Sequence, residues 1–216
     1  MMLYRFLLHL LFPEKCVLCR RMLRMEQLDL CKTCREQSPY YRNRKTKLQF
    51  LDSFTAVWYY EKNVRKSLHR YKFGRARHYA PAYGRLLAIC LQNHGPKDFD
   101  LLTWVPVSRL RRLTRGYDQV QLLAEEMGNA LEIEPVALLK KIRHNRPQSG
   151  IRGDAQRRAN VLGAYREIDC EAIAGKRILL LDDILTTGAT AGECARVLKM
   201  AGAKEVHCAV IAAARK

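Results

Sequence analysis

The segment from Ile178 to Thr190 constrains the fold more than any other part of the chain. It begins with four successive apolar residues, Ile178 to Leu181, a run typical of a strand buried on both faces of a parallel sheet. Two acids, Asp182 and Asp183, follow, and then a turn of hydroxyl residues with one glycine leads into a helical pattern. This order predicts a ligand site at the carboxyl edge of a parallel α/β sheet, because helix N-termini and strand ends meet there.

The rest of the chain supports a mostly parallel sheet flanked by helices, since apolar strand-like runs alternate with helical apolar spacing. The predicted strands are Phe54–Tyr60, Leu101–Val107, 177–183 and Val206–Ala213, and the predicted helices are Val64–Phe73, Tyr79–Gln92, Gln119–Leu131 and Thr190–Met200.

The acid pair and the turn suit a sugar phosphate. Adjacent carboxylates can bind the two hydroxyls of a ribose, or magnesium through its waters. The turn offers hydroxyls, backbone N–H groups and a helix dipole to one phosphate, and Gly188 permits close approach. The alternative is a strand, turn and helix with an acidic N-terminal cap, which accounts for one Asp and one Thr but not for the whole run.

Four cysteines near the N-terminus form two C-x-x-C pairs, Cys16 with Cys19 and Cys31 with Cys34. This spacing indicates a structural zinc site with four thiolate ligands. The alternatives are an iron–sulfur site, a redox pair or unligated thiols. Since about 40 residues bury too little core to fold alone, we expect a zinc-stapled segment over 1–45 and an α/β domain over 50–216.

The net charge of +18 is concentrated in two places. Residues 61–85 contain eight Lys or Arg against one acid, and residues 140–160 contain seven against one. Such clusters suit a polyanion, either a pyrophosphate or nucleic acid, although a solvated surface explains the first cluster equally well. No apolar run approaches a membrane span. We expect no stable membrane insertion, a cytoplasmic, reducing location, and a short packed helix over Met1–Phe12.

The segment 178–190 resembles the 5-phosphoribosyl-1-pyrophosphate (PRPP) signature of type I phosphoribosyltransferases. The resemblance implies that PRPP binds with magnesium and that the catalytic acids Asp182 and Asp183 hold the ribose hydroxyls. The residues that would cradle the 5′-phosphate are Thr186, Thr187, Gly188, Ala189 and Thr190.

Two further segments match that family by their order in the chain. A pyrophosphate loop is expected at Val107, Ser108 and Arg109, where basic residues and backbone amides suit a polyanion. The basic, glycine-containing stretch over 140–160 is expected to be a flexible loop that closes over the substrate. Its candidate residues are Arg146, Gln148 and Arg157, and His144 lies in the same stretch.

Nearly the whole chain resembles the ComF competence family, although Tyr117 and Asp118 stand where that family usually has Phe and Asn. The shared motifs are the Leu-Phe-Pro-x-x-Cys start, the cysteine pairs, Tyr71-Lys72-Phe73, the Val-Pro-Val-Ser run from Val105, Arg115–Gln119, Gln148, Arg157 with Asn160, and the PRPP signature over 178–190.

The ComF resemblance implies a role in DNA uptake or utilisation, with single-stranded DNA and a competence helicase as candidate partners. Two functions remain open at this point. One is a phosphoribosyltransferase with an unknown acceptor. The other is a non-catalytic module that binds nucleic acid or senses the ligand with the same fold.

Overall fold

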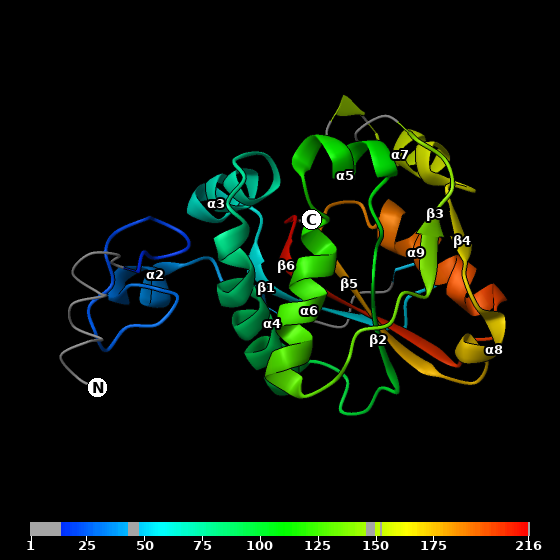
Figure 1. Ribbon diagram of the computed structural model, residues 1–216, viewed down its shortest axis with the longest axis horizontal. Coiled ribbons are helices and arrows are strands. Elements are labelled where there is room, and N and C mark those ends of the chain that lie inside the picture. The colour runs from blue at the N-terminus through cyan, green and yellow to red at the C-terminus, as the bar shows by residue number, and fades with distance from the viewer. Residues whose placement is uncertain (1–13, 43–47, 146–149, 152, 216) are drawn as a thin grey trace.

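The computed structural model describes residues 14–42, 48–145, 150–151 and 153–215. The helix predicted over Met1–Phe12 lies outside this range, as do Arg146 and Gln148. Figure 1 shows an α/β body with the cysteine segment at one side.

The main sheet has four parallel strands in the order β1-β6-β5-β2, which confirms the predicted fold class. The central strands β5 and β6 are buried along almost their whole length, as expected for continuous apolar strands. The bounds are β1 Ser53–Tyr59, β2 Leu101–Trp104, β5 Arg177–Leu185 and β6 Glu205–Ala213.

Helices cover both faces of this sheet (Figure 1). Alternate residues of β5 face opposite layers, so Leu179 packs with the first layer and Leu180 with the second. The first layer contains α3 Lys62–Phe73, η1 Arg77–Tyr79, α4 Ala80–His94 and α6 Gln119–Leu131; the second contains α9 Ala189–Met200, α7 Asp154–Val161, α8 Cys170–Ile173 and the hairpin of β3 Leu139–Lys141 and β4 Tyr165–Glu167.

The cysteine segment packs against the first layer. Its helix α2 spans Lys32–Gln37, and its buried residues Val17, Leu18 and Leu30 belong to the same apolar cluster as Leu68 and Tyr83 of α3 and α4. The segment and the sheet therefore share one hydrophobic core on this side.

The structure differs from the sequence prediction at several places near the site. Strand β2 ends at Trp104 instead of Val107, and residues 109–115 form a helix that was not predicted. Strand β5 continues two residues past the acids, because Ile184 and Leu185 pair with Ala212 and Ala213 of β6. Within the stretch expected to be a loop, residues 154–161 form helix α7. The acids therefore lie inside the strand, and part of the predicted loop has regular structure.

Among the described residues, no helix has the length and apolar character that crossing a membrane requires.

Candidate functional site

The ends of β2 and β5 bring the predicted phosphate and pyrophosphate segments to one edge of the sheet. The two strands are parallel neighbours, and Val105 N donates to Leu181 O at 2.9 Å just beyond β2. The loop that leads to helix α5, Arg109–Arg115, therefore starts beside the acid pair. Figure 1 places α5 at the same end of the body as α7.

The two acids project to opposite faces of β5, as successive strand residues must. Asp183 faces the first layer, where its carboxylate contacts Lys72 Nζ at 2.8 Å and accepts a hydrogen bond from Gln119 Nε2 at 3.3 Å. Asp182 faces the second layer, near Cys194, and its Oδ1 accepts from the backbone N–H of Asp183 at 2.8 Å. Both residues are buried: 9% of the surface of Asp182 is exposed, and 3% of that of Asp183.

Two segments that are far apart in sequence, the end of α3 and the start of α6, converge on Asp183 of β5. Lys72 lies in the last turn of α3, and Gln119 is the first residue of α6. Tyr71 Oη donates to Gln119 O at 2.6 Å, and Tyr117 Oη donates to Tyr71 O. The sequence identifies these motifs only through the family resemblance, and no local pattern in it predicts Lys72 and Gln119 as the partners of Asp183.

Burial and the adjacent charge shape the protonation of Asp182. Desolvation, with a smaller contribution from Asp183, raises the pKa of Asp182 to about 8, while Lys72 opposes the shift. Near neutral pH the neutral carboxyl of Asp182 is therefore the favoured form in the ligand-free protein.

The turn after β5 is accessible and shaped for an anion. Gly188 adopts the left-handed conformation, with φ at +80°, and is the N-cap of α9. Ala189 N donates to Thr187 Oγ1 at 3.2 Å, and the turn residues except Ala189 are partly exposed. The N-terminus of a twelve-residue helix thus faces a turn that solvent reaches.

The predicted pyrophosphate loop is held by buried side chains. Val107 N donates to Asp118 Oδ2 at 3.1 Å, while Asp118 Oδ1 accepts from Val120 N and Gln121 N and caps α6. Asp118 is therefore a structural anchor for the loop. Burial raises the pKa of its carboxyl.

Ser108 is the N-cap of α5 and lies buried, whereas Arg109 is exposed. Ser108 Oγ hydrogen-bonds with His144 Nδ1 at 3.0 Å, and Arg111 Nη2 donates to Asn145 O at 3.1 Å. The start of the predicted flexible loop thus contacts the pyrophosphate loop directly.

Arg157 is the one candidate of the flexible loop that the described residues include. It lies half-buried in α7, and its Nε donates to Ile151 O at 2.9 Å. This hydrogen bond joins two residues of the predicted flexible loop, so it does not itself link the loop to the acid pair or the phosphate turn.

The four predicted zinc ligands meet in one cluster. The Sγ atoms of Cys16, Cys19, Cys31 and Cys34 all lie within 4.8 Å of one another, and those of Cys19 and Cys31 are 3.6 Å apart. Tetrahedral zinc with Zn–S bonds near 2.3 Å requires sulfur atoms about 3.8 Å apart, so the donor set fits structural zinc.

Polar contacts fix this cluster to the first helical layer. Arg70 Nη2 donates to Leu18 O at 2.8 Å, and Ser67 Oγ donates to Val17 O. Asp29 accepts from Arg85 of α4 at 2.5 Å. The knuckle therefore braces α3, the helix that carries Lys72.

We expect Cys31→Ser to lose the zinc that the wild-type chain holds, because three thiolates leave the tetrahedral site open. Metal analysis should give about one zinc per wild-type chain, and limited proteolysis should cut the variant faster within 14–37. Cys170→Ser removes an exposed cysteine outside the cluster and should behave as wild type. Equal zinc content in Cys31→Ser and wild type would contradict the assignment.

We expect Asp182→Asn to stabilise the ligand-free protein at pH 8. The folded state keeps a proton on Asp182 that the unfolded chain has lost, so the free energy of unfolding falls between about pH 4 and pH 8. The amide keeps the acceptor for Asp183 N. Urea denaturation should show a gain of at least about 1 kcal/mol at pH 8 that shrinks toward pH 4.

The control for this prediction is Asp98→Asn, which removes an exposed carboxylate at the amino edge of the sheet. It should show no comparable pH-dependent gain. The same gain for Asp182→Asn at pH 5 and pH 8 would contradict the raised pKa.

The sequence matches models of known protein domains and several known proteins. The phosphoribosyl transferase domain model matches residues 117–216, and the double zinc ribbon domain model matches residues 7–45. Competence protein F of Haemophilus influenzae is 25% identical over 219 residues, covering 91% of this chain and 95% of that protein.

Two further relatives match a shorter part. Competence protein ComFC of Streptococcus pneumoniae is 31% identical, covering 71% of this chain and 65% of that protein. DNA utilization protein YhgH of Escherichia coli K12 is 27% identical, covering 65% of this chain and 63% of that protein. With its cysteine cluster packed against a parallel sheet of the phosphoribosyltransferase type, the chain is a homologue of the competence proteins F and ComFC and of YhgH.

Proposed function

We propose that this protein binds PRPP with magnesium at the carboxyl edge of the sheet and acts in DNA uptake or utilisation. The observation that carries the proposal is the buried acid pair of β5, which leads within three residues into a solvent-accessible, glycine-containing turn at the start of α9. The matched phosphoribosyl transferase domain supports the choice of ligand.

Each part of the ligand has a partner of suitable chemistry. Residues 186–190 would receive the 5′-phosphate through backbone N–H groups and hydroxyls. Asp182 and Asp183 would accept hydrogen bonds from the ribose hydroxyls. Ser108, Arg109 and the backbone amides of their loop would face the pyrophosphate.

The oxygen donors at this edge also fit magnesium, which prefers carboxylates, phosphates and its own waters. When bound, magnesium would neutralise charge on the pyrophosphate. Lys72 has a related task in the ligand-free protein, because its ammonium group balances Asp183 at 2.8 Å. The acid pair is thus kept in place before any ligand arrives.

As an enzyme, the protein would transfer the phosphoribosyl group to an acceptor. Its residues would hold the sugar in position and stabilise charge, because no described side chain of the acid pair or the turn acts as an obvious general base. Arg157 and the basic stretch around it would offer positive charge to the leaving pyrophosphate.

We expect calorimetry with PRPP and magnesium to show binding by the wild-type chain, weakened at least tenfold in the double variant Asp182→Asn/Asp183→Asn. Lys72→Met should also weaken binding, since it leaves Asp183 buried without its cation. Asp98→Asn serves as the matched control. Equal affinity of the double variant and wild type, with both folded by circular dichroism, would overturn the proposal.

A second function, binding of single-stranded DNA, is favoured by one surface feature. Phe73 is 59% exposed at the end of α3, with His69 beside it and the Arg115 guanidinium 5.0 Å from its ring centroid. Exposed Arg65 and Lys66 lie on the same helix. An exposed aromatic ring among cations is the arrangement on which bases stack.

A competence helicase as partner stays a prediction.

We expect Phe73→Ala to weaken binding of an oligo-dT strand roughly tenfold in fluorescence anisotropy, as loss of one stacking contact implies. Lys66→Glu should weaken it further at low salt, whereas Lys176→Glu, a charge reversal at the amino edge of the sheet, should have little effect. If Lys66→Glu and Lys176→Glu weaken binding of the strand equally, the interaction depends on net charge alone and this surface is not the binding site.

A further inference from the structure

Helix α3 lies between the cysteine segment and the α/β body, as Figure 1 shows. On one side, Ser67 and Arg70 donate hydrogen bonds to the cysteine segment. On the other side, Tyr71 bonds to the start of α6 and Lys72 pairs with β5. Helices α4 and α6 pack closely against each other, and among the described elements α3 has no comparable partner. The position of α3 therefore depends strongly on its side-chain contacts.

The link between α3 and the cysteine segment ends on the turn between the first two predicted zinc ligands. Arg70 Nη2 donates to Leu18 O at 2.8 Å and to Val17 O at 3.3 Å, and these two residues separate Cys16 from Cys19. A bound metal would fix this turn, because it would hold the thiolates at both ends. Hydrogen bonds from a charged donor are roughly twice as strong as neutral ones, so Arg70 is the main polar link.

Charge and geometry both favour this role of Arg70. Four thiolates outweigh the charge of one Zn²⁺, so a loaded knuckle would attract the guanidinium group. From the opposite side the guanidinium is held by Tyr79 of η1, whose Oη accepts from Arg70 Nε at 3.2 Å. The side chain of Arg70 is thus directed at the knuckle by the body of the protein.

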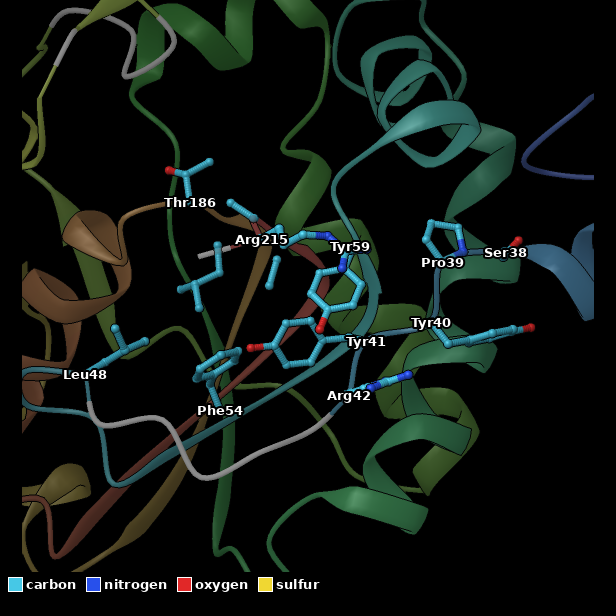
Figure 2. Close-up of a pocket in the computed structure, with 13 residues that line it drawn as sticks. Ser38, Pro39, Tyr40, Tyr41, Arg42, Leu48, Phe54, Tyr59, Thr186 and Arg215 are labelled. Atoms are coloured by element: carbon cyan, nitrogen blue, oxygen red, sulfur yellow. The ribbon is translucent and has the colours of Figure 1, made fainter.

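The cysteine segment is tethered to the sheet at a second place, away from the metal cluster. Tyr59 N donates to Pro39 O at 2.7 Å, and Tyr41 N donates to Val57 O at 3.0 Å. Figure 2 shows Tyr41 beside Tyr59, with Ser38 and Pro39 leading back toward α2. Loss of the metal would therefore loosen the turn that α3 contacts without releasing the segment from β1.

We propose that Arg70 is a positioning residue that couples the cysteine cluster to the acid pair. When the metal fixes the turn, Arg70 holds the last turn of α3 and keeps Lys72 on Asp183. When the turn is loose, α3 shifts and the ion pair weakens. The consequence for ligand binding rests on the proposed function: the zinc-loaded chain binds PRPP with magnesium more tightly than the zinc-free chain, and the ligand in turn favours zinc.

The first test follows Lys72 in the ligand-free protein. An ammonium group paired with a carboxylate resists acylation, whereas a released lysine reacts. We expect an N-hydroxysuccinimide ester, read by mass spectrometry, to modify Lys72 severalfold faster in Arg70→Gln and in Cys31→Ser than in wild type. Lys176, exposed at the amino edge of the sheet, should react at one rate in all three chains.

The variant Arg70→Gln separates the link from the metal, because the four cysteines stay intact. Metal analysis and circular dichroism should show a folded chain that retains zinc. If this variant does not fold, Arg70→Lys takes its place; it keeps the charge but has one nitrogen for two carbonyls, and it should change the reactivity of Lys72 in the same direction. Arg24→Gln, the same change at an exposed arginine of the knuckle, is the control and should behave as wild type.

The second test is calorimetry with PRPP and magnesium. We expect Arg70→Gln to weaken binding roughly fivefold or more, the lower end of usual coupling between two sites. In the Lys72→Met background the same change should have little further effect, since both residues act through one contact.

The outcomes separate this inference from the function on which it rests. A wild-type rate of Lys72 modification in a zinc-retaining Arg70→Gln chain would overturn it, as would a fully additive loss of affinity in Lys72→Met/Arg70→Gln. If PRPP does not bind the wild-type chain, the proposed function fails, and the modification of Lys72 alone still decides whether Arg70 couples the two sites.

Discussion

The site depends on keeping two adjacent carboxylates buried at the edge of a sheet. An ionised carboxylate in this position is unfavourable unless it is paired and hydrogen-bonded. Asp183 obtains its cation from Lys72 of α3 and a hydrogen bond from Gln119 of α6. Asp182 has no such ion pair among the described residues, and burial raises its pKa. The positions of α3 and α6 on the sheet are thus tied to the chemistry of one strand.

The cysteine cluster is part of the same arrangement, although it does not line the site. Arg70 of α3 donates to the carbonyl of Leu18 in the knuckle, and Lys72 follows two residues later. Rotation or displacement of α3 would therefore disturb both contacts together. Zinc would stabilise the knuckle, the knuckle braces the helix, and the helix places the ammonium group on Asp183. The cysteine segment would thus help to position the charged groups of the candidate site, which its sequence does not reveal.

The sequence predicted the elements well and their contacts poorly. Continuous apolar runs identified β5 and β6, helical spacing identified α6 to the residue, and cysteine spacing identified the cluster. The extension of β5 past its acids depends on pairing with Ala212 and Ala213, which no local pattern encodes. The partnership of Lys72 with Asp183 joins residues far apart in the chain. Helix α7 has few apolar residues, and strands β3 and β4 have three residues each, too short for periodicity to show.

The ion pair between Lys72 and Asp183 also bears on the order in which ligands bind. Removing one partner from a buried pair is unfavourable by about 3–5 kcal/mol, because the other charge is left uncompensated. A ligand that displaced Lys72 from Asp183 must therefore bring a cation of its own. On the proposed function, PRPP alone would add negative charge beside the buried carboxylate of Asp183. On the proposed function, magnesium would supply the missing charge, so we expect PRPP and the metal to enter together and to release Lys72 toward the ligand.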